Sequence, residues 1–434
     1  MATTGSEDTV TPQQTSIHLA LGEAGTLDYA MVKRAVEAAV REDDRLDWKQ
    51  APYQGDKAKE EFAKDVAALA NARGGIIVIG VAEERGTGAA ATIHPFKAVD
   101  DGLERTMRSW LHNTVSPAVS GVGFHPLPAD EGGTDGVLVV SVPPSPETPH
   151  MVGSDRSIGF PNRVGTQTMW MREPDIERSY RQRFDRRVSD EEHLDLLIDR
   201  AARHWDTSQD AWIAIATRPM VLRSASLPRP NREDIVEIFN GTTRHRADMK
   251  VNERETNAVV STLSDAALNP RAGLRSWMAA YRPGGEPADR AKYAYASIHD
   301  DGSLVLAIQT ANWGSDPVAG TCPVREGDIA GIAVDLVACV AAAAERFGIQ
   351  GEHLARVRLI RANEDPLVYY APHRVGSMTL STNPVSWSLS VETFEPVDAI
   401  IPALVDVEVM RESVDDLARQ AVSQFGVSDV HIWD

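Results

Sequence analysis

The chain has 434 residues, of which 42% are hydrophobic and 25% are charged, and its formal net charge is −19 at pH 7. A typical single domain has roughly 100 to 200 residues, so we expect two or three domains with hydrophobic cores. The strong negative charge argues against a protein that coats nucleic acid nonspecifically, because phosphate binding usually depends on clustered Lys and Arg.

The N-terminal segment is polar, and we expect residues 1–24 to form a disordered tail. It lacks the basic segment and apolar run of a signal peptide, which predicts a cytoplasmic protein. The longest apolar stretch, residues 329–344, contains Asp335 and is shorter than the roughly 20 residues needed to cross a bilayer. We therefore expect a buried core helix there and no association with membranes.

The first half of the chain alternates helical and strand patterns. Apolar spacing predicts helices at residues 27–40, 57–72 and 103–111, and strands at residues 46–50, 76–81, 119–124 and 137–142. The run at 76–81 is continuously apolar, which is typical of a strand buried on both faces. Gly74 and Gly75 precede it, and we favour a helix C-cap over a phosphate-binding turn because GxxxxGK[ST] occurs nowhere.

An acidic and lysine-containing segment coincides with the first predicted strand. Asp47 and Lys49 are two residues apart, so their side chains leave the same face of the strand while Leu46 and Trp48 leave the other. Carboxylates can hold Mg²⁺ or Mn²⁺, and a lysine can stabilise a phosphate, as phosphodiester cleavage requires. The alternative is a surface ion pair, which is the commoner role of charges on one strand face.

Residues 163–187 form the most basic stretch of the chain. It contains seven arginines against four acidic residues, and Trp170 lies between Arg163 and Arg172. Arginine suits phosphate oxygens, and the indole can stack on an unpaired base. A helix surface with ion pairs four residues apart, such as Glu177 with Arg181, explains the same pattern equally well.

Three separated blocks together resemble the Schlafen-type AlbA-like domain, which is also described as a divergent ATP-binding module. The resemblance extends over about residues 26–184. The matching residues are Glu42, Leu46, Asp47, Trp48 and Lys49 in the first block, Ala70, Asn71, Gly74, Gly75, Gly80 and Val81 in the second, and Phe160 to Thr166 with Pro174 to Glu177 in the third.

The resemblance implies a nucleic-acid-binding protein, regulatory or related to defence, in which Arg163, Trp170, Arg172 and Arg181 contact RNA or DNA. The alternative is a metal-dependent endoribonuclease or other nuclease, in which Glu42, Asp47 and Glu83 hold Mg²⁺ or Mn²⁺ and Lys49 assists the phosphate. Ala82 stands where the family often has an acid, so Glu83 or Glu84 has to supply the third carboxylate. A second alternative is a protein-interaction scaffold without nucleic-acid activity.

The second half has a different character. Residues 1–188 hold 21 Lys and Arg against 27 Asp and Glu, whereas residues 189–434 hold 23 against 36. The charged residues 185–192 indicate a boundary, so we predict a Schlafen AlbA-like α/β domain at 25–188 and a mixed α+β domain at 189–434. The fold class is therefore α+β.

The predicted elements of the second half offer no recognisable chemistry. We expect helices at 191–205, 232–239, 327–347 and 413–425, and strands at 211–216, 277–282, 293–298, 303–310, 355–360 and 385–393. Cys322 and Cys339 lack the spacing of a zinc site or a disulfide framework, and His299, His353 and His373 are scattered singly. An interaction or sensing role, through a protein partner or a homo-oligomer, is the expectation for this half.

Overall fold

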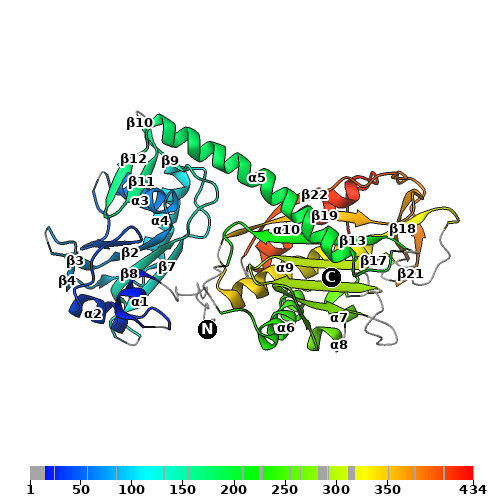
Figure 1. The fold of residues 1–434 in the computed structure, drawn as a ribbon, viewed down its shortest axis with the longest axis horizontal. Coiled ribbons are helices and arrows are strands. Elements are labelled where there is room, and N and C mark those ends of the chain that lie inside the picture. Colours follow the sequence, from blue (N-terminus) through cyan, green and yellow to red (C-terminus); the bar gives the residue numbers. More distant parts are fainter. Residues whose placement is uncertain are drawn as a thin grey trace. The chain divides into compact units, whose positions relative to one another are not determined.

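The structure is a computed structural model that describes residues 15–433 except 24, 56, 85, 131, 155–156, 208–209, 224–227, 254–255, 264, 282–290, 292, 311–317, 350, 376–377 and 404–405. Its internal contacts divide the chain into two compact units, Met1–Arg186 and Arg187–Asp434. Helices and sheets occur in both units, and the α+β fold class predicted from the sequence is confirmed (Figure 1).

The first unit combines short helices with small sheets. Its elements are α1 (Ser16–Leu21), α2 (Tyr29–Glu37), β1 (Leu46–Lys49), α3 (Ala58–Ala70), β2 (Gly75–Ile79), β3 (Val81–Glu83), β4 (Ala90–Ile93), β5 (Phe96–Lys97), α4 (Asp101–Thr114), β6 (Val115–Ser116), β7 (Gly123–Pro128), β8 (Asp135–Val142), β9 (Met151–Ser154), β10 (Ser157–Gly159), β11 (Pro161–Val164), β12 (Gln167–Trp170) and the start of α5 (Glu173–Ala202).

The main sheet of this unit has the order β1-β2-β8-β5, and β7 also pairs with β8. Strand β1 runs parallel to β2, and β2 runs antiparallel to β8. Ile77 and Ile79 of β2 pack in one core with Phe62 of α3, whereas Ile76 and Val78 pack in a second core on the opposite face. Strand β2 is therefore buried on both faces, as its continuous apolar run predicts.

The glycine pair that precedes β2 has a structural reason, which is clearest at Gly75. Its φ is 155°, and a Cβ at this position would lie 2.2 Å from the carbonyl oxygen of Arg45. Any side chain would therefore collide with the backbone just before β1, and only glycine allows β2 to pair so closely with its neighbour. The structural interpretation of Gly74 and Gly75 accounts for the pair without a ligand.

The prediction of a disordered tail over residues 1–24 is wrong for residues 16–21. Residues 16–21 form helix α1, which begins after the capping residue Thr15. Ile17 of this helix is fully buried and packs with Leu27 and Met31. The buried isoleucine accounts for the order of this segment, while residues 1–14 lie outside the described part of the chain.

The second unit contains the remaining elements. They are the rest of α5, β13 (Trp212–Pro219), α6 (Arg232–Asp248), α7 (Val259–Leu263), α8 (Asp265–Leu268), β14 (Arg271–Gly273), β15 (Ser276–Ala280), β16 (Ala294–His299), β17 (Leu304–Gln309), β18 (Cys322–Arg325), α9 (Glu326–Phe347), β19 (Glu352–Ile360), β20 (Leu367–Val375), β21 (Met378–Pro384), β22 (Val397–Pro402) and α10 (Val407–Ser423).

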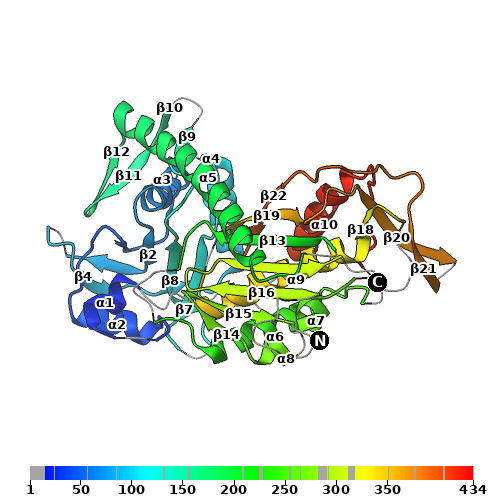
Figure 2. The same ribbon diagram turned by 45° about the vertical axis from the view of Figure 1, so that its right-hand side comes forward.

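An antiparallel sheet with the order β14-β15-β16-β17-β13-β19-β22 organises this unit (Figure 2). One face packs against helices α6, α9 and α10 in the largest core of the described residues. The other face packs against Leu194, Leu197 and Ile198 from the C-terminal part of α5. The sheet therefore lies between two helical layers.

Helix α9 is the central element of the second unit. Among the described residues it is the one helix whose length and composition would allow a membrane crossing, and 94% of its apolar window is buried inside the protein. The helix is longer than residues 329–344, because it begins at Glu326 and ends at Phe347. Its burial agrees with the predicted core helix.

One strand expected in the second half differs from the structure. Residues 385–393 form turns and irregular chain rather than the predicted strand, and the hairpin of β20 and β21 precedes them. Val385 and Val391 of this segment are partly buried against the core of the second unit, whereas Trp387 and Leu389 are exposed. The division between the two compact units, at Arg186 and Arg187, falls within the charged residues 185–192, and this segment is part of the continuous helix α5.

Candidate functional site

Strand β1 places the acidic and lysine residues on one face. Leu46 and Trp48 point into the core that contains Ile76 and Val78, as the alternation of a strand requires. Asp47 and Lys49 leave the opposite face, toward helix α3, where Lys49 meets Asp65. The predicted arrangement of Asp47 beside Lys49 is the one observed.

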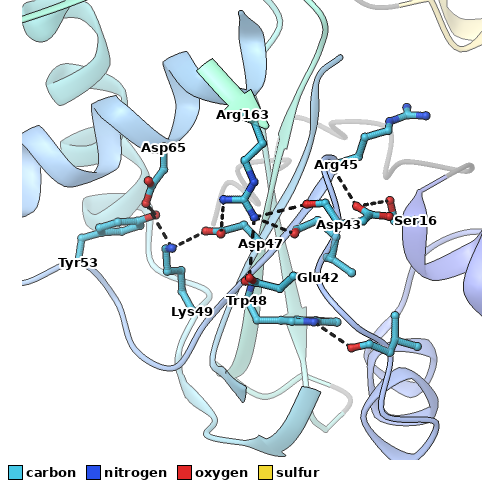
Figure 3. Close-up of polar contacts among 12 residues, drawn as sticks. Ser16, Glu42, Asp43, Arg45, Asp47, Trp48, Lys49, Tyr53, Asp65 and Arg163 are labelled. Atoms are coloured by element: carbon cyan, nitrogen blue, oxygen red, sulfur yellow. Dashed lines mark hydrogen bonds and ion pairs between the residues drawn. The ribbon is translucent and has the colours of Figure 1, made fainter. Parts of the chain in front are cut away.

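Asp47 is held between two cations (Figure 3). Its Oδ1 accepts a hydrogen bond from Nη1 of Arg163 at 2.8 Å, and its Oδ2 lies 2.5 Å from Nζ of Lys49. Asp47 and Arg163 are only 4% and 7% exposed. A buried carboxylate is stable only when its charge is compensated, and here Arg163 and Lys49 compensate it.

Lys49 continues the network to helix α3. Its Nζ lies 3.4 Å from Oδ2 of Asp65, which also accepts a hydrogen bond from the Tyr53 hydroxyl at 2.9 Å. Burial alone would lower the pKa of Lys49, but the carboxylates of Asp47 and Asp65 outweigh burial and raise it. Lys49 therefore stays protonated, and its ammonium group is paired with Asp47 and Asp65.

Asp65, the partner of Lys49 on α3, is buried. It lies on the face of α3 that packs against β1, and its charge is balanced by Lys49. Burial, followed by the Asp65 charge, also raises the pKa of Tyr53 well above its usual range. Tyr53 and Asp65 are thus members of the network that the sequence did not indicate.

Glu42 lies on the other side of Arg163. Its Oε1 accepts a hydrogen bond from the backbone N–H of Trp48 at 2.7 Å, and its Oε2 is 3.9 Å from Nη2 of Arg163. Burial raises the pKa of Glu42 to about 7, the Trp48 N–H opposes this shift, and the nearby charge of Asp47 adds to it. The glutamate therefore exchanges a proton near neutral pH.

The structure does not join Glu83 to a three-carboxylate metal centre. Glu83 is exposed at the end of β3, and Glu84 is also exposed and accepts a hydrogen bond from the hydroxyl of Thr87. Within the described residues, which include Glu42, Asp47 and Glu83, no group of three His, Cys, Asp or Glu side chains is placed to hold a metal ion. The cation between Glu42 and Asp47 is the guanidinium of Arg163, so this donor set does not fit Mg²⁺ or Mn²⁺.

Of the four residues predicted to contact nucleic acid, Arg163 is buried, whereas Trp170, Arg172 and Arg181 are exposed. Arg163, on β11, is buried against Asp47 and cannot reach a phosphate, so its predicted role is replaced by this ion pair. Trp170, on β12, is 55% exposed, and Arg172 follows it on the surface. Arg181 of α5 is exposed and paired with Glu177, as the ion-pair alternative predicts.

Asn71 holds the base of the hairpin formed by β11 and β12. Its Nδ2 donates to the carbonyl oxygens of Pro161 at 2.7 Å and His150 at 2.9 Å, and its Oδ1 accepts from the N–H of His150 at 2.6 Å. Asn71 belongs to the second block that resembles the Schlafen-type domain, and this was the feature of the sequence that pointed to a structural role.

A comparison with known protein families identifies part of the first unit. Residues 42–172 match the sequence model of the family described as Schlafen, AlbA_2, and no curated protein matches the chain. The DIP2311 protein from Corynebacterium diphtheriae, a solved structure, shares 18% identity and a TM-score of 0.22, over 33% of this chain and 29% of that chain. The family match supports a nucleic-acid-related function in general terms, and residues 42–172 are therefore a Schlafen AlbA-like domain.

Proposed function

We propose that the Schlafen AlbA-like domain binds nucleic acid, without cleaving it, through the exposed side of the β11–β12 hairpin and the start of α5. The observation that carries the proposal is the exposure of Trp170 and Arg172 at the end of a hairpin with a buried anchor, Arg163. An aromatic ring and a guanidinium on a rigid support are the groups that bind bases and phosphates.

The charges on this surface favour an anionic ligand. Within the described residues, no carboxylate lies within salt-bridge distance of Arg172 or Arg186. Arg178 and Arg181 are paired with Asp175 and Glu177, but these pairs are exposed. Exposed pairs of this kind contribute little to stability, so a phosphate can replace the carboxylate at small cost.

The buried network favours binding over metal-dependent cleavage. Both oxygens of Asp47 contact cationic side chains, and Lys49 is divided between Asp47 and Asp65. A metal ion at Asp47 would have to displace Arg163 and leave its guanidinium buried without a partner, which is costly. The role of these residues in our proposal is to hold the hairpin, and cleavage is the alternative that the experiment tests.

The experiment measures binding of the full chain to labelled single-stranded RNA, structured RNA and duplex DNA, in Mn²⁺ and in EDTA. We expect a retarded, intact nucleic acid under both conditions and at least a tenfold loss of affinity in the variant Trp170→Ala/Arg172→Ala. The matched control is Trp387→Ala/Arg419→Ala, which removes an exposed tryptophan (68% exposed) and an exposed arginine from the second unit.

Two other results would reject the proposal. Cleavage that requires Mn²⁺ and disappears in Glu42→Ala/Asp47→Ala would establish the nuclease alternative. The absence of any interaction with all three nucleic acids would favour the scaffold alternative, in which the acidic second unit binds a protein partner or a second copy of the chain.

A further inference from the structure

The indole of Trp170 rests on a glycine. A Cβ on Gly159, the last residue of β10, would lie 2.6 Å from both Cε3 and Cζ3 of the Trp170 ring. No real Cβ approaches an aromatic carbon so closely, so only glycine allows the ring to occupy this place. The ring is thus supported by backbone on one side and remains 55% exposed.

The backbone of the hairpin fixes the position of this ring. Trp170 lies opposite Pro161 in the register of β11 and β12, and the N–H of Met171 donates to the carbonyl of Phe160 at 2.8 Å. The carbonyl of Pro161 is in turn held by Asn71. The ring is therefore carried by a paired strand that is tied to α3, not by a loop.

A supported and exposed indole suits one chemical class of ligand. An unpaired nucleobase presents a flat π-face that can cover the ring, whereas the bases inside a duplex are already stacked on each other. Arg172 lies two residues beyond Trp170 and is exposed, which places a cation close in sequence for the adjoining phosphate. Both features indicate a single strand.

We infer that Trp170, supported by Gly159, is a stacking platform for an unpaired base, so that the ligand of this surface is single-stranded nucleic acid. This inference rests on the proposed nucleic-acid-binding function and specifies its substrate class. Trp170 contacts the base, and Gly159 is a positioning residue because it acts only through the ring.

The experiment compares a fluorescein-labelled single-stranded oligonucleotide with its blunt duplex, by anisotropy, for four variants of the full chain. Trp170→Leu is expected to weaken single-strand binding by about 5- to 100-fold and duplex binding much less. Trp170→Phe keeps a ring and should retain most of the affinity. Gly159→Ala keeps the tryptophan but displaces it, and should lose affinity as Trp170→Leu does. Trp387→Leu is the control and should bind like the unmodified protein.

A second readout separates stacking from loss of structure. Stacking releases no counterions, so Trp170→Leu should keep the salt dependence of binding, whereas Arg172→Ala should reduce the slope by about 0.7 on a single strand. Thermal unfolding of each variant reports whether the fold is kept. If Gly159→Ala does not fold, the comparison of Trp170→Leu with Trp170→Phe still tests whether Trp170 stacks on a base.

The possible results distinguish this inference from the proposed function. Preferential loss of single-strand binding in Trp170→Leu, with recovery in Trp170→Phe, would support the platform. Unchanged affinity in Trp170→Leu would overturn the platform and leave nucleic-acid binding intact. Failure of the unmodified protein to bind either form would overturn both.

Discussion

Glu42 makes the stability of the first unit depend on pH. Its pKa in the folded protein is about 7, above the ordinary value of 4.5. Between these values the folded state holds a proton that the unfolded chain releases, so the stability that the protonated Glu42 contributes is lost as the pH rises through this window. The backbone hydrogen bond from Trp48 partly limits the effect.

We therefore predict that Glu42→Gln stabilises the protein above pH 7. Glutamine keeps an acceptor for the N–H of Trp48 and removes the charge, so the gain should be about 1 kcal/mol at pH 8, after discounting for partial exposure, and near zero at pH 4.5. Urea unfolding at both pH values measures this. Equal effects of the substitution at pH 4.5 and pH 8 would contradict the assignment.

His353 gives the opposite pH dependence in the second unit. It is fully buried on β19, and neither ring nitrogen has a hydrogen-bond partner in the described part of the chain. Burial lowers its pKa to about 4. Below about pH 6.5 the imidazole of His353 binds a proton in the unfolded chain but not in the folded protein. The free energy of unfolding therefore falls as the pH decreases from about 6.5 to 4.

The variant His353→Leu should lack this acid-side loss. The unmodified protein should lose up to about 3 kcal/mol from this residue between pH 7 and pH 4, while the leucine variant should lose correspondingly less. The comparison uses the slope of unfolding free energy against pH, so a packing change caused by leucine does not affect it. Identical slopes for the two proteins would show that His353 has a partner on folding.

The sequence predicted the local geometry of the site but not its partners. The alternation along β1 was sufficient to place Asp47 beside Lys49, because a strand has a period of two. Arg163 is 116 residues from Asp47 in the sequence, and its basic neighbourhood suggested a surface role. Only the tertiary fold brings β11 next to β1, so no local pattern could have revealed this ion pair.

At the scale of elements, the Asp47–Arg163 pair fastens the β11–β12 hairpin to the main sheet. Removing one partner of a buried pair leaves an uncompensated charge, so Asp47→Asn and Arg163→Gln should each cost about 3 kcal/mol. The double variant should cost less than the sum of both, by about 1 to 3 kcal/mol. Urea unfolding of the four proteins completes the cycle, and effects that add within about 0.5 kcal/mol would mean that the two residues do not interact.

Most elements with a strong periodic pattern were predictable. The helix at 57–72, the strand at 76–81 and the core helix at 327–347 correspond to α3, β2 and α9. The hairpin of β20 and β21 was missed, and α1 was assigned to a tail. The formation of both depends on contacts with distant residues, such as the parallel pairing of β18 with β20, and propensity alone does not encode such contacts.

For the whole molecule, the net charge of −19 limits how nucleic acid can be held. The overall field repels phosphates, so binding has to rely on the few arginines of the start of α5 and on stacking. We predict that log K against log salt concentration has a slope between about −1 and −3 on a single strand, which corresponds to a few phosphate contacts. Titrations between 50 and 200 mM KCl measure the slope, and a value steeper than about −5 would indicate a larger basic surface elsewhere.

The α+β fold class and the Schlafen AlbA-like identity of the first unit could be recognised from the sequence, because motif residues such as Asn71, Gly75 and Trp48 have demanding structural roles. No family motif was recognised in the sequence of the second unit. A polar contact of this unit, between Arg246 of α6 and Asp335 of α9 at 2.7 Å, is buried inside the core and stabilises packing. The sequence of the second unit therefore indicates a fold but no catalytic or binding site.

The most direct test of the account is the binding of a labelled single-stranded RNA to the unmodified protein and to Trp170→Leu, in Mn²⁺ and in EDTA. The account predicts that the unmodified protein binds the RNA under both conditions, that the RNA remains intact, and that the variant binds at least fivefold more weakly. Equal binding by the two proteins, or cleavage of the RNA that depends on Mn²⁺, would contradict it.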